Sequence, residues 1–303
     1  MTVTHNSERE LEALLDSAEH HLPGAQMLVV DCDSQDSSLD AARARTSVKA
    51  IDLGENIGFG RACNRAVAEV STPVTILVNP DVELLDDSLL TIAAEALRPD
   101  RAERLLAPLV LSPDGALQDT VHPAPCSAAD LIRALVPPAC LPAGAGGVAL
   151  APQRAAVPRR VGWAVGCALV ARTATLRRLG PFDETIFMYG EDLELGLRAG
   201  QQGIATWFWP TARVLHHRAH SSRRAFGGEP FERHALARHD VVARRLGRRH
   251  AALDDAAQAV TFATRLTLKR ALRRPATRER RQLAALMAMR TGTPVPGAPR
   301  RTR

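Results

Sequence analysis

The sequence predicts an α/β fold in which helices flank a mixed, mostly parallel β-sheet. Short apolar runs of strand length alternate with helical patterns over the first third of the chain. Alternation at this spacing is typical of βαβ units, which place consecutive strands in parallel. The chain has 303 residues, 46% of them hydrophobic and 24% charged, which is enough to bury a large core around such a sheet.

The predicted strands of the N-terminal part each end in a polar turn. The chain opens with the β-branched segment Thr2–Thr4, and a helical pattern follows Ser7. The next predicted strands cover residues 26–30, 48–53 and 73–78, with helical patterns between them. Ligands of parallel sheets bind beyond the carboxyl ends of the strands. We therefore expect Asp31, Asn56 and Asp81, which each follow a strand, to lie along one edge of the sheet.

The middle of the chain is less regular. The predicted strands of this part cover residues 105–111, 161–170, 205–209 and 212–215. Residues 122–160 are rich in proline, alanine and glycine, which predicts a long, partly mobile loop over the site. The first strand of the chain is short, which leaves open a start upstream of Met1.

The segment Phe182–Arg198 carries five carboxylates among aromatic and apolar residues. Its leucines and the glycines that follow predict a short helix that begins near Glu191, so that Glu191 and Asp192 stand in the first turn. A carboxylate held among groups that exclude water suits a general base. Acids in a first turn also stabilise the helix through its dipole, and this segment alone leaves both interpretations open.

Asp81 is the candidate metal ligand. It follows Asn79 and Pro80 at the end of a predicted strand, where a carboxylate can join a hard divalent cation to a diphosphate. The same tripeptide is also a common turn. The acidic turn at 31–36 could accept hydrogen bonds from a nucleotide base or a ribose. The loop at 54–60 lacks both the dinucleotide fingerprint and the lysine of a P-loop, so it predicts neither site.

Taken in order, these motifs resemble those of the family 2 glycosyltransferases with the Rossmann-like GT-A fold, and in particular the rhamnosyltransferase-like branch. The resemblance covers residues 2–222. It is carried by the acidic turn, the Asn-x-Gly-Phe loop, Asn-Pro-Asp, VGWxxGCxLVxR, FDExxFMYGEDxELxxR and VLHHxxHSS. The FDExxFMYGEDxELxxR motif is the most specific of these.

The resemblance implies roles for particular residues. Asp192 is the expected general base with Glu191 beside it, and Asp81 and His216 are the expected ligands of Mg²⁺ or Mn²⁺. The residues expected to bind the donor nucleotide are Thr4, Asp31, Asp33, Asn56, Gly58, Asn64, Asn79 and Asp81. The residues expected on the acceptor side are Trp163, Gly166, Asp183 and Tyr189. Asn79 stands where a full DxD motif has its first acid, so metal binding is expected to depend on Asp81 and the diphosphate.

The number of acidic groups favours an inverting transfer. Inversion needs one base for the acceptor hydroxyl and one cation for the leaving diphosphate, whereas a retaining double displacement needs a second carboxylate as nucleophile. The resemblance points to enzymes that transfer rhamnose from dTDP-rhamnose to lipid-linked cell-wall intermediates of actinobacteria. A UDP-sugar donor and a polysaccharide acceptor are the alternatives within this class.

Charge is distributed unevenly along the chain. Residues 223–303 hold twenty Arg and Lys against six Asp and Glu, whereas the first 222 residues hold nineteen against twenty-seven. Helical spacing predicts two basic helices, around 260–274 and 278–289, before a disordered end. We therefore predict a catalytic domain at 1–222 and a helical extension at 223–303 that binds an anionic membrane surface. A solvated arginine-rich surface is the alternative interpretation.

Several features predict a cytoplasmic protein that is peripheral on the inner face of the plasma membrane. The chain has no apolar run of about 18 residues and no secretory signal after Met1. Its five cysteines are widely spaced, form no CxxC pair and are expected to be reduced thiols.

Two other functional classes compete with the glycosyltransferase. A sugar nucleotidyltransferase would need a basic phosphate-binding loop near the N-terminus, where Arg9 is the one basic residue of the first ten. A nucleic-acid-binding module could use the basic C-terminal segment. That segment has few aromatic residues and no nucleic-acid-binding motif, so no nucleic acid partner is expected.

Overall fold

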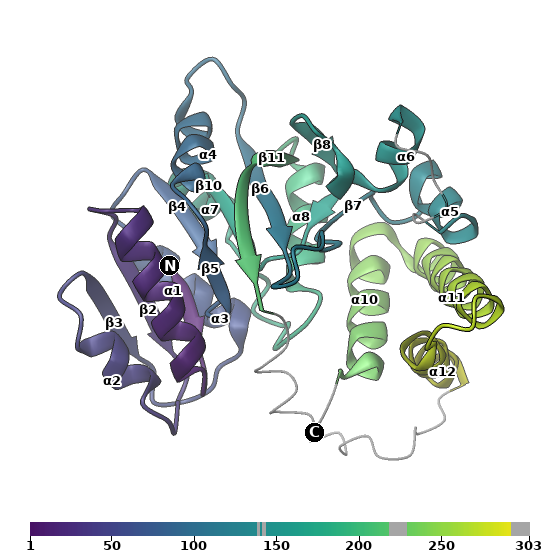
Figure 1. Cartoon of the computed structure of the whole chain (residues 1–303), viewed down its shortest axis with the longest axis horizontal. Helices are drawn as coiled ribbons and strands as arrows, with labels where there is room; N and C mark the ends of the chain where they lie inside the picture. Colours follow the sequence, from purple (N-terminus) through teal and green to yellow (C-terminus); the bar gives the residue numbers. More distant parts are fainter. Residues whose placement is uncertain (138–139, 141–143, 218–228, 292–303) are drawn as a thin grey trace. The chain divides into compact units, whose positions relative to one another are not determined.

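The chain divides into two compact units in the computed structural model, which describes residues 1–137, 140, 144–217 and 229–291. The first unit comprises Met1–His122 with Ala151–Gly228, and the second comprises Pro123–Leu150 with Glu229–Arg303. Figure 1 shows the elements of both units. The boundary predicted at Ser222 lies outside the described residues, as do His220 and Ser221 of the last motif. The division into 1–222 and 223–303 therefore stays a prediction.

The first unit is built on a mixed sheet. Its strands are β1 (Thr2–Thr4), β2 (Met27–Asp31), β3 (Val48–Asp52), β4 (Val74–Val78), β5 (Val82–Leu84), β6 (Arg104–Leu111), β8 (Arg159–Val161), β10 (Ala168–Arg172) and β11 (Ala205–His216). Strands β1, β2 and β3 pair in parallel, and a second group has the order β4-β10-β6-β11-β5. The Met1 N–H group donates to the Ile76 carbonyl and the Val78 N–H to the Met1 carbonyl, which joins β1 to β4.

Strand direction changes across the sheet. In the second group β11 runs parallel to β6, whereas β10 is antiparallel to both β4 and β6, and β5 and β8 are antiparallel to β11. A separate small sheet pairs β7 (Val121–His122) with β9 (Trp163–Ala164). The α/β prediction with a mixed sheet and flanking helices is confirmed.

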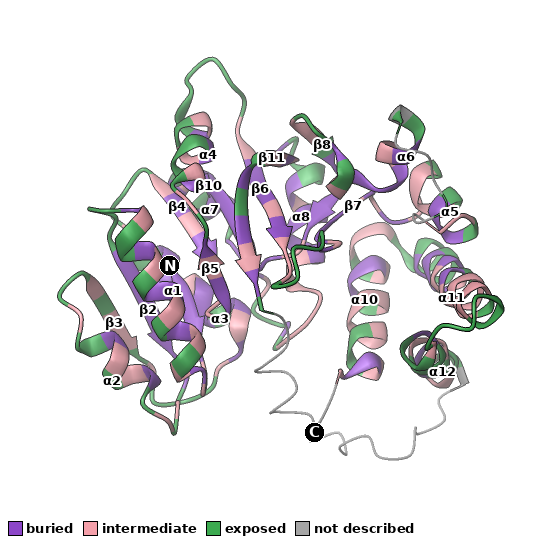
Figure 2. Ribbon diagram, viewed as in Figure 1, coloured by how far each residue is buried: buried purple, intermediate pink, exposed green. Residues whose placement is uncertain are grey.

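Helices cover both faces of this sheet. They are α1 (Glu8–His21), α2 (Ser38–Arg43), α3 (Phe59–Glu69), α4 (Ser88–Leu97), α7 (Thr173–Leu179) and α8 (Glu191–Gln201). Consecutive strand residues point to opposite faces, so Val29 joins the core beneath α1 and α4 while Val30 joins the core beneath α3, α7 and α8. The central strands are accordingly buried on both sides (Figure 2), which explains their continuous apolar runs.

The structure corrects three predictions of the middle region. Residues 122–160, predicted to be a long loop, contain α5 (Ala128–Leu135), α6 (Ala145–Leu150) and the short 3₁₀ helix η2 (Pro152–Arg154). The strand predicted at 161–170 is broken into the end of β8, β9 and the start of β10. The two strands predicted at 205–215 form the single strand β11, with an irregularity between Trp209 and Arg213.

The second unit consists of helices that are joined by contacts between buried carboxylates and partly exposed basic side chains. It contains α5 and α6 with α10 (Phe231–Leu246), α11 (Arg248–Ala271) and α12 (Thr277–Thr291). Arg238 binds Asp254 at 2.7 Å, His239 binds Asp255 at 2.8 Å, and Lys269 binds Glu279 at 2.6 Å. Helix α5 belongs to this bundle because the Thr264 hydroxyl donates to the carbonyl of Ala134.

The described C-terminal segment, 229–291, contains one more helix than the sequence predicts there. Helix α10 was not expected, and α11 begins well before the predicted start near residue 260. Residues 292–303, predicted to be disordered, lie outside the described part of the chain. None of the helices traced through the described residues has the length and apolar character that crossing a membrane requires.

Candidate active site

The carboxyl ends of β1 and β2 present two buried polar side chains. Asp31, which is 1% exposed, ends β2, and its Oδ1 accepts the N–H of Ser34 at 2.9 Å. Its Oδ2 is buried and has no hydrogen-bond partner among the described residues. The hydroxyl of Thr4, at the end of β1, is likewise buried and without a hydrogen-bond partner there. A buried acceptor without a donor costs about 1 to 3 kcal/mol, so this edge of the sheet favours a ligand that donates hydrogen bonds.

A tight loop network supports Asp31. Asn6 and Asp33 both have positive φ angles, 53° and 61°, conformations that asparagine and aspartate tolerate better than most residues. The Asn6 N–H donates to the Ser34 hydroxyl, and the Asn6 side-chain oxygen accepts the N–H of Gln35. The exposed Asp33 carboxylate accepts from the Gln35 amide at 2.9 Å.

The loop at 54–60 packs against the segment that leads to α8. Gly58 has φ of 88°, and a Cβ atom there would lie 2.4 Å from the Phe187 carbonyl oxygen, so any larger residue is excluded. Asn56 Oδ1 accepts the Gly58 N–H at 3.1 Å. The Asn64 amide bonds both the N–H and the carbonyl of Phe182, each at 2.9 Å. Asn56 and Asn64 therefore hold backbone in place, and their binding of a nucleotide stays a prediction.

Asp192 lies in the first turn of α8, where the sequence predicted it. Tyr189 and Gly190 both have positive φ, 70° and 85°, and turn the chain sharply into the helix. Asp192 Oδ2 accepts the Gly166 N–H at 3.2 Å and Oδ1 accepts the Leu193 N–H at 2.7 Å. Two N–H donors and the helix dipole all favour the ionised carboxylate, which is the form that a general base needs.

Glu191 has a different environment from its neighbour. The residue is partly exposed as a whole, but its Oε2 atom is buried and has no hydrogen-bond partner in the described structure. Burial, followed by the charge of Asp192, raises the pKa of Glu191 from 4.5 to about 8. The surroundings of the Glu191 carboxyl therefore favour its neutral form.

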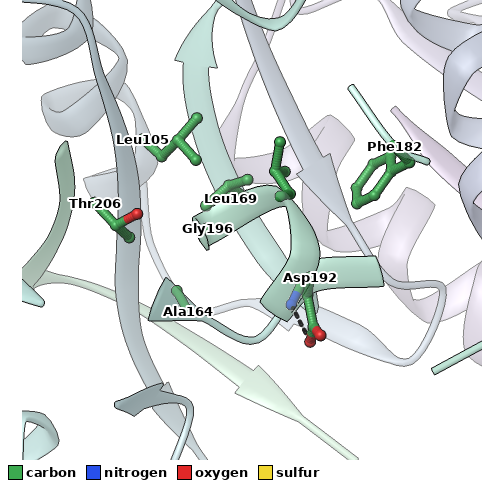
Figure 3. A pocket seen from close by; sticks show the side chains of 9 residues that line it. Leu105, Ala164, Leu169, Phe182, Asp192, Gly196 and Thr206 are labelled. Carbon is green, nitrogen blue, oxygen red and sulfur yellow. Dashed lines mark hydrogen bonds between the residues drawn. The ribbon is translucent and has the colours of Figure 1, made fainter. Parts of the chain in front are cut away.

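A small pocket lies behind Asp192 (Figure 3). It is lined by Leu105, Ala164, Gly166, Leu169, Phe182, Asp192, Leu195, Gly196 and Thr206. Most of these side chains are apolar and buried, so they keep water from the inner side of the carboxylate. Gly166 lies directly beside this carboxylate, since a Cβ atom there would be in ordinary contact with the Asp192 Cβ, at 3.5 Å.

Asp81 and His216 face each other at the carboxyl ends of β4 and β11. His216 Nε2 lies 3.2 Å from Asp81 Oδ1, and both side chains are largely buried, with 11% and 9% exposed. His216 Nδ1 lies 3.0 Å from Gln118 Oε1. The neighbouring His217 pairs with Glu83 instead and is more exposed. Of the two histidines, His216 is thus the one whose side chain reaches the Asp81 carboxylate, whereas His217 donates its backbone N–H to the Asp81 carbonyl.

The residues 166–167 connect the two acidic groups. The Gly166 N–H bonds Asp192, and the carbonyl of Cys167 accepts the N–H of Asn79, which is two residues before Asp81. The candidate base and the strand end that carries Asp81 are therefore attached to consecutive residues of one backbone segment.

The Asp81 and His216 pair fits a divalent cation that is completed by other ligands. Neighbouring ligands of an octahedral Mg²⁺ lie about 3 Å apart, since the metal–oxygen distance is 2.0 to 2.1 Å; the measured separation is 3.2 Å. The described residues contain no group of three or more His, Cys, Asp or Glu side chains that could hold a metal. A cation here would need phosphate oxygens and water to complete its coordination, as Mg²⁺ commonly does.

Two of the expected acceptor-side residues have structural contacts. Trp163 is 8% exposed, its ring stacks on that of His122 at 4.4 Å, and it packs where Gly196 of α8 has no side chain. Asp183 Oδ1 accepts both the N–H and the hydroxyl of Thr185. Trp163 Nε1 is buried without a hydrogen-bond partner among the described residues. Binding of an acceptor by these residues stays a prediction.

Sequence reasoning missed Gln118, Asn6 and Ser34. Gln118 is 2% exposed and contacts a histidine 98 residues later in the chain. Its one sequence signal is the Ser-Pro-Asp-Gly turn at 112–115, which returns the chain along β6 so that the Gln118 N–H bonds the Val110 carbonyl. Asn6 and Ser34 sit in turns that were recognised, but their side-chain partners could not be read from the turns.

Comparison with known proteins is consistent with this geometry. The model of the glycosyl transferase family 2 matches residues 1–104. An N-acetylglucosaminyl-diphospho-decaprenol L-rhamnosyltransferase of Mycobacterium tuberculosis is 33% identical over 211 residues, which are 65% of this chain and 68% of that protein. Rhamnosyltransferase WbbL of Escherichia coli is 31% identical over 85 residues, 28% of this chain and 32% of that protein.

A solved structure shares the fold. The mannosyltransferase PcManGT from Pyrobaculum calidifontis, in complex with GDP-Man and Mn²⁺, is similar with a TM-score of 0.57 and 15% identity, over 96% of this chain and 85% of that chain. From these likenesses and the fold described above, the chain belongs to family 2 of the glycosyltransferases, in its rhamnosyltransferase-like branch, and has the GT-A fold.

Proposed function

We propose that this glycosyltransferase transfers rhamnose from dTDP-rhamnose, with inversion, to a hydroxyl group of a lipid-linked sugar of the cell envelope. The choice of donor sugar and acceptor rests on the name of the mycobacterial relative, which acts on a diphospho-decaprenol-linked sugar. The observation that carries the mechanism is the attachment of Asp192 and the Asp81 strand end to residues 166–167. This attachment supports a site in which Asp192 acts as the base and the strand end with Asp81 binds the diphosphate.

Each part of the site has a role in this proposal. Asp31 Oδ2, a buried acceptor, receives the ring N–H that thymine and uracil both offer. Asp81 and His216 hold Mg²⁺ or Mn²⁺, which when bound neutralises charge on the leaving diphosphate. Asp192 accepts the proton of the acceptor hydroxyl, and the apolar side chains behind it keep that proton from bulk water. Glu191, whose surroundings favour its neutral form, adds little negative charge beside Asp192.

The second unit supports a site of action at the membrane surface. Three acids of its C-terminal segment, Asp254, Asp255 and Glu279, are buried and paired inside the bundle, whereas many of its arginines are exposed. Leu253 and Val260, one heptad apart on α11, are exposed apolar residues of the same unit. A surface of this kind suits the anionic headgroups of a membrane that carries a polyprenyl-diphosphate acceptor. We propose that the enzyme works peripherally on the cytoplasmic face.

The donor and metal site is tested by thermal unfolding with dTDP, UDP or GDP, each with and without Mg²⁺. We expect dTDP with Mg²⁺ to stabilise the wild type by about 2.7 kcal/mol at 100 times its dissociation constant, and Asp81→Ala to abolish the effect of Mg²⁺. Asp40→Ala, at an exposed aspartate of α2, is the control and should behave as the wild type. Stabilisation by UDP alone would exclude dTDP-rhamnose, and no response to any nucleotide would exclude the site.

The base is tested by Asp192→Asn, which keeps the shape of the side chain but cannot accept a proton. We expect kcat to fall about 10²- to 10⁴-fold while the dissociation constant for dTDP changes little, because the donor is bound elsewhere. Initial rates at saturating donor and calorimetric titration of dTDP measure the two quantities. Retention of the wild-type kcat would assign the proton transfer to another group.

Glu191→Gln tests the buried carboxyl through stability. A folded-state pKa of about 8, above the unfolded value of 4.5, means that the wild type loses stability as pH rises from about 4.5 through about 8. Glutamine cannot ionise, so we expect the free energy of unfolding of the variant to gain on the wild type by on the order of 1 kcal/mol per pH unit in this window. Urea unfolding across the window measures it. Glu12→Gln, at an exposed site on α1, is the control, and its free energy of unfolding should change with pH as that of the wild type does. The same result for Glu191→Gln would mean that the Glu191 carboxyl is solvated, contrary to this prediction.

Membrane binding is tested on the full chain, because α5 belongs to the same bundle as the C-terminal helices and truncation would remove its partners. The double change Arg270→Glu and Arg274→Glu should weaken sedimentation with anionic vesicles at least tenfold, since each basic residue near such a surface contributes about 1 kcal/mol. The matched control, Arg43→Glu with Arg101→Glu, reverses two exposed arginines of the first unit. Equal losses of vesicle binding in the two double variants would mean that net charge alone explains the binding. If the wild type did not sediment with anionic vesicles, the proposed membrane binding would be refuted.

A further inference from the structure

The amide of Gln118 has one orientation that satisfies its surroundings. Its Nε2 donates to the carbonyl of His216 at 2.7 Å and to the carbonyl of Leu111 at 3.2 Å. Exchanging the nitrogen and the oxygen of the amide would set an oxygen against these two carbonyl acceptors. The Oε1 atom is therefore the one that faces His216 Nδ1, at 3.0 Å.

This orientation determines the tautomer of His216. Because an amide oxygen can only accept, Nδ1 must carry the hydrogen, and in the neutral imidazole Nε2 then carries the lone pair. That lone pair is directed at Asp81 Oδ1, 3.2 Å away. Two acceptors thus face each other at the spacing of neighbouring ligands around an octahedral cation.

We propose that Gln118 is a positioning residue, which fixes the imidazole of His216 with its Nε2 lone pair towards Asp81 so that the two side chains are prepared to bind the divalent cation of the donor diphosphate. The inference rests on the metal site of the proposed function and extends it to a residue outside every motif of the sequence. Partners of metal-binding histidines commonly act in this way, by accepting the hydrogen of the other ring nitrogen. Without Gln118, the opposite tautomer becomes favourable, because Nε2–H can then donate to Asp81.

Gln118 also has a structural role that the experiment must separate from this one. Its two hydrogen bonds to backbone carbonyls join the end of β11, at His216, to the end of β6, at Leu111. A comparable side-chain to backbone hydrogen bond holds β11 without contacting His216: the hydroxyl of Ser88 accepts the N–H of Arg213 on β11 at 3.0 Å. Ser88→Ala is therefore a matched control for loosening β11.

The test uses the full chain and compares the wild type with Gln118→Met, Gln118→Glu and Ser88→Ala. Long-range ¹⁵N–¹H spectra of histidine-labelled protein at alkaline pH report the tautomer, with the His216 signals identified by their loss in His216→Ala. We expect hydrogen on Nδ1 in the wild type and in Ser88→Ala, and on Nε2 in Gln118→Met. Circular dichroism establishes that each variant is folded.

Calorimetric titration of Mn²⁺ in the presence of dTDP gives the second readout. Affinity for Mn²⁺ should fall about 10- to 100-fold in Gln118→Met and remain at the wild-type level in Ser88→Ala. Gln118→Glu keeps an acceptor for Nδ1–H but sets its second oxygen against the carbonyls of Leu111 and His216; where circular dichroism shows that it is folded, its affinity should lie closer to the wild type than to Gln118→Met.

The outcomes separate this inference from the proposed function. Hydrogen on Nε2 in the wild type, or unchanged Mn²⁺ affinity in folded Gln118→Met, overturns the role of Gln118. If Asp81→Ala abolishes Mn²⁺ binding while Gln118→Met leaves it unchanged, the metal site stands and the positioning role alone fails. If the wild type binds no Mn²⁺ with dTDP, both fail together.

Discussion

The geometry of the candidate site depends on two consecutive backbone groups between β9 and β10. The N–H of Gly166 holds one oxygen of Asp192, and the carbonyl of Cys167 holds the N–H of Asn79 at the end of β4. Both bonds use main-chain atoms, so the relative position of the two acidic groups is determined by the path of the backbone. The absence of a side chain at Gly196 adds a further constraint, because a Cβ atom there would lie 2.5 Å from the Trp163 Cβ, so glycine allows α8 to approach β9.

Helix α8 is attached to the segment that precedes it through Arg198, which forms a buried ion pair with Glu194 of the same helix. Glu194 is 1% exposed, and Arg198 bonds both its oxygens, the carbonyl of Pro181 and, through its second nitrogen, the carbonyl of Leu179. A buried pair carries a desolvation cost, which here is offset by the backbone carbonyls that the guanidinium also satisfies. The segment between α7 and α8 is therefore held at its start by Arg198 and along its length by Asn64 and the loop at 54–60.

The sequence predicted the elements whose pattern lies in neighbouring residues, and it missed the features that depend on contacts between residues far apart in the chain. Strands β2, β4 and β6 and helix α8 were found because apolar runs, helical spacing and glycine stops reflect burial of neighbouring residues. The region at 122–160 was misjudged because proline, alanine and glycine are poor indicators when a helix such as α5 is stabilised by packing on α11. Gln118 could not be found, because its role is defined by a histidine 98 residues away. Asp81 and Asp192 were singled out by their places after a predicted strand and in a predicted first helical turn, and the motif resemblance then implied their roles, which stay predictions.

Glu191 and Asp192 illustrate how position alone can give two adjacent carboxylates opposite preferences for negative charge. Asp192 receives two N–H donors, whereas Oε2 of Glu191 is buried without one, so negative charge is favoured on the first and disfavoured on the second. If Asp192 is the base, the two N–H donors that stabilise its negative charge would also weaken its attraction for a proton. Such a base can still serve a glycosyl transfer, because the acceptor hydroxyl becomes acidic only as it bonds to the sugar carbon and the diphosphate departs. Strong stabilisation of that diphosphate then matters more than a strong base, which is why the pairing of Asp81 with a pre-oriented His216 is the part of the proposed mechanism on which the rate would depend most.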